Sequence, residues 1–177
     1  MSKLAFIFPG QGAQKAGMGK DFYENSEAAR SFFDQAQKIL DFDLKEMCFG
    51  EHEELNLTEY TQPCMVSVCL AIVQELKKRG INPDITAGLS LGEYAAVAAA
   101  GGMNELDAIK LVRRRGILMQ STVPAGEGAM AAVLGLDAKK IEEILESFEN
   151  VWIANYNCPG QIVITGLTNE VQQASLA

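Results

Sequence analysis

Residues 85–100 read ITAGLSLGEYAAVAAA, and this stretch decides the fold class. The short apolar run Ile85–Ala87 predicts a strand, and the alanine-rich segment 93–100 predicts a helix. Between them, the glycines of Gly88-Leu89-Ser90-Leu91-Gly92 allow a sharp turn that holds the serine hydroxyl out at the edge of the sheet. The N-terminus of the next helix would then point at any oxyanion that forms nearby. We predict a nucleophilic Ser90, and the simpler alternative is a serine that only caps the helix.

Strands and helices continue to alternate on both sides of this stretch. Leu4–Phe8 is predicted as a buried strand, and helices are predicted where apolar residues recur at helical spacing or form a run between capping residues. The first of these helices covers residues 25–40. The second covers 64–79, with Pro63 in its first turn and Gly80 as its stop. The third is capped by Asn104 and reaches Met119. The alternation indicates an α/β fold with a mostly parallel sheet.

The pattern changes after residues 123–128, which have the densest turn composition of the chain, and we expect a domain boundary there. The following residues predict a β-α-β-β order and then the start of a helix, which is how a ferredoxin-like unit begins. The predicted elements are a strand 129–134, a helix 138–148, strands 151–156 and 161–165 with a turn at 157–160, and a helix from 169. Because such a unit continues with a fourth strand, we expect the chain to end inside a domain.

Composition excludes several classes of protein. The chain has 15 Lys and Arg against 23 Asp and Glu, a net charge of −8, which argues against nucleic acid as a partner. The longest apolar run, 64–73, is shorter than the roughly 20 residues that span a bilayer, and the first ten residues are too short for a secretory signal. Four cysteines without a CxxC pair, and one histidine, indicate neither a zinc site nor a disulfide framework. We expect a reducing, cytoplasmic compartment and no membrane contact.

The glycine-rich segment Gly10–Lys15 follows the first predicted strand. It lacks the third glycine of a dinucleotide-binding motif, because Lys15 stands there, and no acidic residue ends a second strand about 20 residues on. A phosphate-binding P-loop is excluded as well, since Asp21 follows Gly19-Lys20 where Ser or Thr is needed. We therefore predict no cofactor. The segment is either a loop that offers backbone N–H donors to a ligand or a plain surface turn.

Three consecutive arginines, 113–115, lie in the helix predicted after Asn104. Arg113 and Arg114 have Lys110 about one turn away, whereas Arg115 has only apolar neighbours there, so we predict that Arg115 points inward. A guanidinium among apolar side chains needs an anion. Arg115 therefore binds either a substrate carboxylate or an internal Asp or Glu. The apolar neighbours of Arg115 are Leu111, Val112, Leu118 and Met119.

A serine nucleophile needs a base, and no complete triad can be assembled from these residues. The only histidine, His52, lies in the charged segment 50–54, which is more simply a solvated loop. GxSxG triads also place their histidine after the serine. Either another group activates Ser90 or the base lies outside the chain.

Six separated motifs together resemble malonyl-CoA:acyl carrier protein transacylase of type II fatty acid synthesis. They are FPGQGAQ at 8–14 with GMG at 17–19, TQP at 61–63, GLSLGEY at 88–94, RG at 115–116 with MQ at 119–120, GAMAA at 128–132 and NYNCPGQ at 155–161. The resemblance covers essentially the whole chain. It implies an α/β-hydrolase-like large subdomain at 1–125 with an inserted ferredoxin-like small subdomain at 126–177, incomplete at its C-terminus.

The resemblance also implies a reaction. Ser90 would take a malonyl group from malonyl-CoA as an ester and pass it to the phosphopantetheine thiol of acyl carrier protein, for fatty acid synthesis. The backbone N–H groups of Gln11 and Leu91 would form the oxyanion hole, and Arg115 would pair with the free malonyl carboxylate. Further residues that would line or flank the pocket are Gln62, Asn155 and Asn157.

Two departures from the family stand out. Leu89 replaces the histidine that the family usually has before its nucleophile, which removes a polar ring beside the acyl pocket and bears on acyl selectivity. Family chains are also longer, and their activating histidine follows the small subdomain, so we expect the base to be absent from these 177 residues. Two alternatives stay open: a non-catalytic module that binds acyl carrier protein or acyl-CoA, and an unrelated GxSxG esterase. We also expect this piece alone to be poorly soluble or to pair with a complementing segment, because open sheet edges invite pairing.

Overall fold

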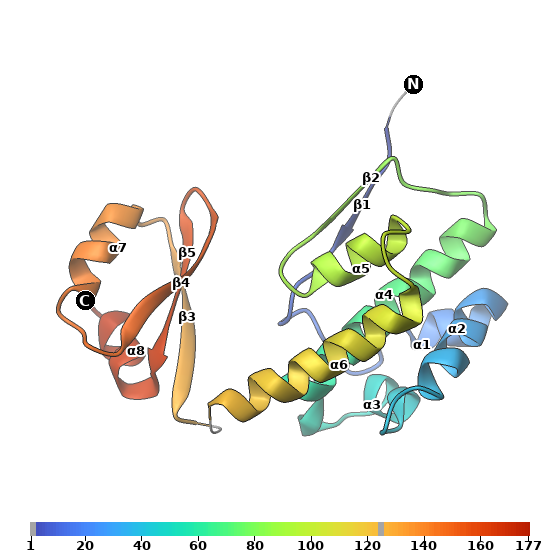
Figure 1. Cartoon of the computed structure of the whole chain (residues 1–177), viewed down its shortest axis with the longest axis horizontal. Coiled ribbons are helices and arrows are strands. Elements are labelled where there is room, and N and C mark those ends of the chain that lie inside the picture. Colours follow the sequence, from blue (N-terminus) through green and yellow to red (C-terminus); the bar gives the residue numbers. More distant parts are fainter. Residues whose placement is uncertain (1–2, 124–125) are drawn as a thin grey trace. The chain divides into compact units, whose positions relative to one another are not determined.

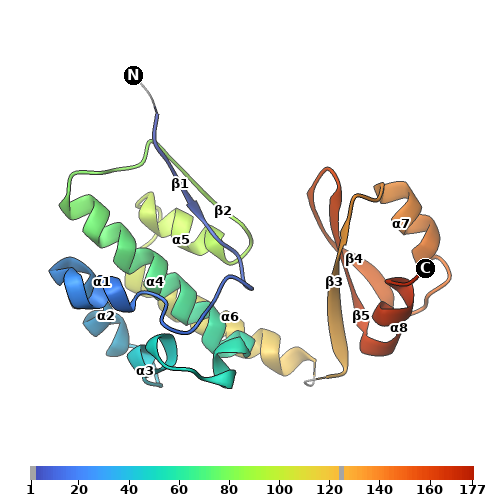
Figure 2. The ribbon, with the colours of Figure 1, turned by 180° about the vertical axis from the view of Figure 1, so that it is seen from behind.

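The computed structural model of the chain describes residues 3–123 and 126–177 (Figures 1 and 2). Its contacts divide the chain into two units, one up to Gln120 and one from Ser121. The boundary expected after residue 125 involves residues 124 and 125, which lie outside the described residues. Strands and helices make up both units, so the predicted α/β class is confirmed. No helix within the described ranges is both long and apolar enough to cross a membrane.

The first unit is built on two parallel strands, β1 (Ala5–Phe8) and β2 (Ile85–Gly88). Phe8 pairs with Gly88 where both strands end, and the Leu89 N–H donates to the Phe8 carbonyl oxygen over 3.1 Å. Helix α5 (Gly92–Ala99) follows β2 almost directly and packs against both strands. The strand, turn and helix predicted in this stretch are confirmed.

The prediction that the first strand is buried is wrong in part. Phe8 is buried and Phe6 packs against the core, but Ile7 is 79% exposed. Successive side chains of a strand point to opposite faces. Among the described residues of this unit, only the face that carries Phe6 and Phe8 is covered by the core.

Helices α2 (Glu27–Gln37) and α4 (Thr58–Lys78) pack closely and supply much of the core of the first unit, including the fully buried Phe33 and Leu70 (Figure 1). Apart from α5, the other helices described before residue 123 are α1 (Lys20–Asn25), α3 (Leu44–Phe49), the 3-10 helix η1 (Glu53–Asn56) and α6 (Glu105–Thr122).

Helix boundaries differ from those predicted by a few residues in several places, most notably at Ser26 and at the start of α4. The helix expected over 25–40 is interrupted at Ser26, whose hydroxyl accepts a backbone N–H from the first turn of α2 and so caps it. Helix α4 begins at Thr58, so Pro63 lies inside it and not in its first turn. Asn104 caps α6 as predicted, because its Oδ1 accepts two backbone N–H groups of the first turn at 3.0 and 3.2 Å.

The proline inside α4 has a structural consequence. Pro63 has no N–H to donate to the carbonyl oxygen of Glu59, four residues earlier. The Nη1 of Arg113, on α6, donates to that oxygen over 2.8 Å and to the Glu59 carboxylate over 3.1 Å. The same guanidinium binds both carboxylate oxygens of Asp41 at 2.9 Å. Arg113 therefore joins α6 to the start of α4.

Arg113, and not Arg115, is the arginine that the fold pairs internally. Only 12% of its side chain is exposed, and its Cζ lies 5.1 and 5.0 Å from the ring centroids of Phe42 and Tyr60. This corrects the prediction from helical spacing, which considered neighbours on the same helix. The partners of Arg113 come from other segments of the chain, and the spacing of residues along α6 does not report on contacts with those segments.

Replacing Arg113 is expected to destabilise the first unit. Arg113→Ala leaves a carbonyl and two carboxylates without their donor, so we expect the free energy of unfolding to fall by about 2 kcal/mol. The matched control is Arg114→Ala, on the exposed face of the same helix, which should change it by less than about 0.5 kcal/mol. Chemical denaturation of both variants makes the comparison, and equal losses would contradict the assignment.

The same ion pair makes stability depend on pH in the acidic range. The hydrogen bonds from Arg113 lower the pKa of Asp41 below its ordinary value. A carboxyl group with a lowered folded-state pKa contributes stability above its unfolded pKa and loses that contribution as the pH falls through the folded pKa. Arg113→Ala should therefore flatten the acid limb of the stability curve.

The second unit is a three-stranded antiparallel sheet in the order β3-β5-β4 with helices α7 and α8 (Figure 2). Its own core includes the buried Ile141, Val151 and Ile164. The predicted β-α-β-β order and the following helix are confirmed, whereas a mostly parallel arrangement holds for the first unit only. The elements are β3 (Gly128–Leu134), α7 (Ala138–Leu145), β4 (Val151–Cys158), β5 (Gln161–Leu167) and α8 (Thr168–Ala174).

The turn predicted at 157–160 is tighter than expected. Strand β4 continues to Cys158, which pairs with Gln161, so only Pro159 and Gly160 form the turn. Gly160 has a φ of +82°, a conformation that glycine adopts without strain. A two-residue turn of this kind lets β4 run two residues further than the sequence pattern indicated.

Candidate active site

Ser90 lies in a strained turn between β2 and α5. Its φ is +50°, and it is the only non-glycine residue of the described ranges with a positive φ. Such a conformation costs of order 1–3 kcal/mol and persists only where the surroundings impose it. A Cβ on Gly88 would lie 2.1 Å from the carbonyl carbon of Gly92, and a Cβ on Gly92 would lie 2.3 Å from the carbonyl oxygen of Phe8. Both glycines are required by close backbone contact, and Ser90 itself is exposed.

The glycine-rich loop after β1 lies beside this turn. A Cβ on Gly10 would be 3.0 Å from the Leu89 carbonyl oxygen, so the two loops are in close contact. Side chains tether the loop to the residues before and at the start of α4. Gln11 Nε2 donates to Thr58 Oγ1 and Gln14 Nε2 donates to Asn56 Oδ1, both over 3.1 Å. The loop is therefore held in place and is not a free surface turn.

Backbone N–H groups without a hydrogen-bond partner among the described residues follow both paired strands. They include those of Gln11, three residues after Phe8, and Leu91, three residues after Gly88, and also those of Gly10 and Ser90. Gln11 and Leu91 are the positions predicted for an oxyanion hole. Unpaired donors next to a serine nucleophile are what an acyl-transfer site needs to stabilise a developing oxyanion.

Gln62 contacts the loop from within the core. It is fully buried on α4, and its Nε2 lies 3.3 Å from Gln11 Oε1 and 3.4 Å from Met119 Sδ on α6. Its Oε1 is buried without a partner in the described part of the chain. A buried acceptor without a donor is costly, which makes Gln62 a candidate to bind a polar group.

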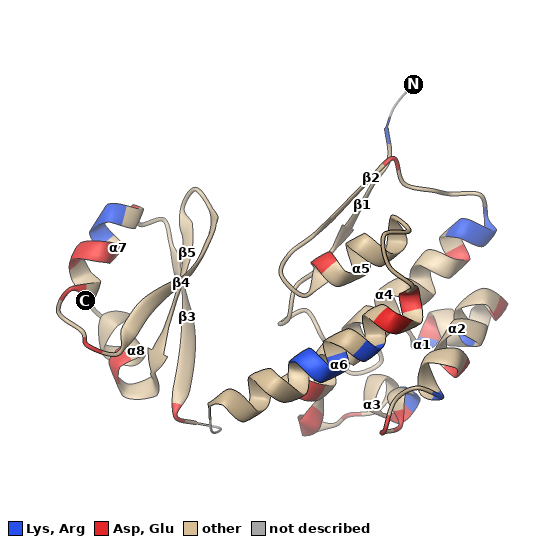
Figure 3. Cartoon of the chain, in the orientation of Figure 1, with Lys and Arg blue, Asp and Glu red and all other residues tan. Residues whose placement is uncertain are grey.

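Arg115 lies on the basic stretch of α6 that Figure 3 marks in blue. Its Cζ is 5.6 Å from the ring centroid of Tyr94, in the first turn of α5. Its guanidinium makes no ion pair or hydrogen bond with any residue in 3–123 or 126–177. Of the two anions predicted for Arg115, an internal carboxylate is thus not found in that part of the chain.

The remaining predicted residues lie apart from this group or in the second unit. His52 Nε2 lies 3.1 Å from Glu46 Oε1. This contact explains the position of the histidine, and the site is not needed to explain it. Asn155 and Asn157 are exposed on β4, and Asn157 Nδ2 donates to Gln161 Oε1 over 3.2 Å. No group of three or more potential metal ligands was found among the described residues.

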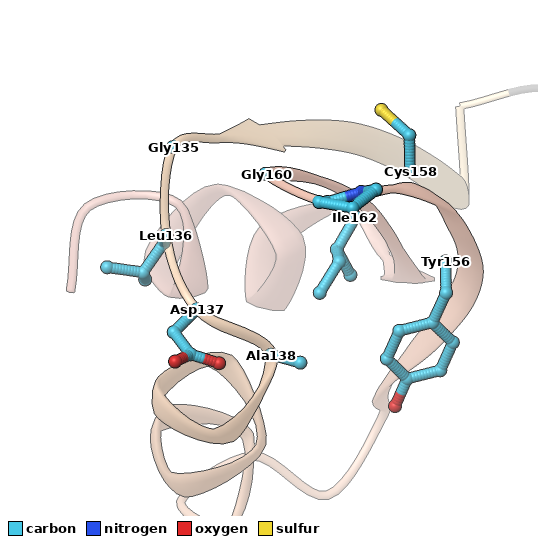
Figure 4. A pocket seen from close by; sticks show the side chains of 9 residues that line it. Gly135, Leu136, Asp137, Ala138, Tyr156, Cys158, Gly160 and Ile162 are labelled. Carbon is cyan, nitrogen blue, oxygen red and sulfur yellow. The ribbon is translucent and has the colours of Figure 1, made fainter.

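The second unit has a hollow of about 620 Å³ at the end of its hairpin (Figure 4). None of the predicted site residues lines it. Two of the side chains that line the hollow are polar and already have partners. The hydroxyl of Tyr156 donates to Glu142 Oε1 over 2.8 Å, and the carboxylate of Asp137 caps α7. These side chains satisfy each other or the helix, so the hollow has no polar group that calls for a ligand.

Three residues that contribute to the site were not predicted from the sequence. Thr58 and Asn56 hold the loop, and no local pattern distinguishes them from other polar residues. Tyr94 belongs to the GLSLGEY motif, and its place one helical turn after Ser90 is a signal that could have drawn attention to it.

Fold and site together define an α/β protein with a strained, exposed serine in the turn between a strand and a helix. Residues 5–176 match the family model described as "Acyl transferase domain", and the chain belongs to this family. It is 48% identical over 180 residues to the malonyl CoA-acyl carrier protein transacylase of Bacillus subtilis (strain 168), covering 99% of this chain and 57% of that protein. The resemblance inferred from the motifs is confirmed.

Solved structures of proteins with such names are also similar to this chain. The malonyl CoA-acyl carrier protein transacylase of Clostridium perfringens has 44% identity and a TM-score of 0.88, covering 98% of this chain and 56% of that one. A malonyl-transacylase solved in complex with its type II PKS acyl-carrier protein has 39% identity and a TM-score of 0.89, with 98% and 58% covered. The chain thus spans a little over half the length of these relatives.

Proposed function

We propose that this chain carries the acylation site of a malonyl-CoA:acyl carrier protein transacylase that serves fatty acid synthesis. The observation that carries the proposal is the strained turn of Ser90 and Leu91 in close contact with the loop of Gln11, with unpaired backbone N–H groups in both. The names of the relatives at 48% and 44% identity support malonyl transfer, and the solved complex supports acyl carrier protein as the partner.

In the proposed reaction the Ser90 hydroxyl attacks the thioester carbonyl of malonyl-CoA and gives its proton to a base. The C–S bond breaks, and coenzyme A leaves as the thiol with that proton. The phosphopantetheine thiol of acyl carrier protein then gives its proton to the same base and attacks the ester, and Ser90 leaves as the hydroxyl. We assign the base to a histidine that is not among these residues, since the His52 side chain has no hydrogen bond to Ser90 in the described residues and contacts Glu46 instead.

We assign the other predicted residues as follows. The N–H groups of Gln11 and Leu91 stabilise the oxyanion of each tetrahedral intermediate. Arg115 binds the free malonyl carboxylate, because its guanidinium has five donors and no carboxylate partner in the described residues. We assign Gln62 and Leu89 to the acyl pocket, and we keep Asn155 and Asn157 on β4 as predicted substrate-binding residues.

We further propose that the first unit is part of an α/β-hydrolase-like subdomain and the second part of a ferredoxin-like one. The strand order β3-β5-β4 supports the second assignment, because the middle strand of the three comes last in the chain. A cytoplasmic, reducing location is supported by four cysteines that are all free thiols.

The carboxylate assignment is tested with Arg115→Ala in the full-length protein. We expect the rate of acylation by malonyl-CoA to fall about 30- to 150-fold, since a charge-assisted hydrogen-bonded pair is lost. Acylation by acetyl-CoA, which has no free carboxylate, should change less than about threefold. Arg114→Ala is the matched control and should leave both rates unchanged. Equal losses with the two thioesters would overturn the assignment.

A further inference from the structure

We propose that Tyr94 is the positioning residue for Arg115, holding its guanidinium against the ring face so that it can receive the free carboxylate of a malonyl group bound at Ser90. This inference rests on the proposed function. Its basis is the contact of 5.6 Å between the Arg115 Cζ and the Tyr94 ring centroid. A cation within about 6 Å of an aromatic centroid is attracted by the ring.

Arg113 provides the comparison within the same helix. Its guanidinium lies near two rings and is hydrogen-bonded to two carboxylates and a carbonyl oxygen, so its donors are used by the fold. Arg115 has one ring and no oxygen partner among the described residues. A ring face attracts the cation without accepting its N–H groups, so the donors of Arg115 stay free for an anion. Tyr94 holds this arginine without neutralising it.

Tyr94 is rigidly joined to the nucleophile. Three successive backbone hydrogen bonds close the turn, each from an N–H group to the carbonyl oxygen three residues earlier. They run from Gly92 to Leu89 at 2.9 Å, from Glu93 to Ser90 at 3.1 Å and from Tyr94 to Leu91 at 3.2 Å. The ring of Tyr94 therefore extends from the same turn that carries Ser90 and the oxyanion donor. One rigid element would set the spacing between the thioester carbonyl and the carboxylate, which favours a short diacid over an uncharged acyl group.

The tyrosine hydroxyl takes no part in this arrangement, because it has no hydrogen bond with any described residue. The ring alone should hold the guanidinium. Tyr94→Phe is thus a conservative variant that keeps the interaction, and Tyr94→Leu removes it while keeping an apolar side chain of moderate size.

The test uses the full-length protein and steady-state acylation with malonyl-CoA and acetyl-CoA. For Tyr94→Leu we expect the KM for malonyl-CoA to rise about 5- to 30-fold with kcat within twofold, and the acetyl-CoA kinetics to stay unchanged. Tyr94→Phe should match the unmodified protein. Equal loss in both variants, an unchanged malonyl-CoA KM in Tyr94→Leu, or equal loss with acetyl-CoA would overturn the inference.

A second measurement applies if Tyr94→Leu fails to fold. Phenylalanine analogues with one, two and three ring fluorines at position 94 keep the packing but weaken the attraction of the ring for a cation. The malonyl-CoA KM should rise with each fluorine, and a constant KM would overturn the inference. If the unmodified protein is not acylated on Ser90 by malonyl-CoA, the proposed function fails. If it is acylated and depends on Arg115 but not on the ring at 94, only this inference fails.

Discussion

Ser90→Ala is expected to abolish covalent labelling of the full-length protein by malonyl-CoA. The acyl group is proposed to be bonded to the Ser90 oxygen, and a methyl group offers no atom to replace it. Loss of a nucleophile that acts within a catalytic unit reduces turnover by about 10⁴-fold or more, so transfer to acyl carrier protein should fall to the background rate. The measurement is intact-mass analysis after brief exposure to malonyl-CoA, followed by peptide mapping of the labelled residue.

The control for this experiment is Ser147→Ala. Ser147 lies in the second unit, where its hydroxyl donates only to the Ile144 carbonyl oxygen at 2.7 Å. This variant should be labelled like the unmodified protein. Ser90→Ala should also unfold at nearly the same denaturant concentration, since alanine and serine meet similar strain at a φ of +50°. Labelling that persists in Ser90→Ala would show that another residue is the nucleophile.

Gly92→Ala is expected to disrupt the site and the fold together. The added Cβ would lie 2.3 Å from the Phe8 carbonyl oxygen and 2.8 Å from that of Pro9, both backbone atoms that cannot rotate away. The end of β1 must move, and the Gln11 loop moves with it. We expect the free energy of unfolding to fall by about 3 kcal/mol or more and acylation of Ser90 by malonyl-CoA to fall at least 100-fold.

The matched control is Gly102→Ala. Its Cβ would meet the Val97 side chain at 3.2 Å and the Val97 carbonyl oxygen at 3.3 Å, contacts that a shift of a few tenths of an ångström relieves. Neither glycine has a positive φ, so both substitutions test space and not backbone conformation. Gly102→Ala should unfold and react like the unmodified protein. A Gly92→Ala protein with normal stability and normal acylation would refute the close contact of the Ser90 turn with β1.

Local patterns in the sequence predicted most of the secondary structure. The strand, turn and helix of residues 85–99 follow from a short apolar run, two glycines and an alanine-rich segment, all of which are local patterns. The cap at Asn104 and the β-α-β-β order of the second unit were readable for the same reason. Where the pattern erred, a single residue changed the outcome, as at Ser26, which caps α2 and ends the helix before it.

The candidate site was predictable in part. The motifs named Ser90, Gln11 and Arg115, whose roles remain predictions, but not the contacts that hold them. Tyr94 reaches Arg115 across 21 positions of sequence, and Thr58 reaches Gln11 across 47. Such contacts depend on how helices pack, and spacing along one helix does not report on packing between helices.

The arginines of α6 separate the two kinds of information most clearly. The sequence by itself determined that a helix carries three consecutive arginines and that a guanidinium facing inward needs an anion. Only the tertiary structure decided which arginine the fold uses, because Asp41 and Glu59 lie 72 and 54 positions before Arg113 and meet it through packing. Their carboxylates occupy Arg113, and Arg115 is left with an aromatic ring and free donors because no acidic side chain of the described chain reaches it.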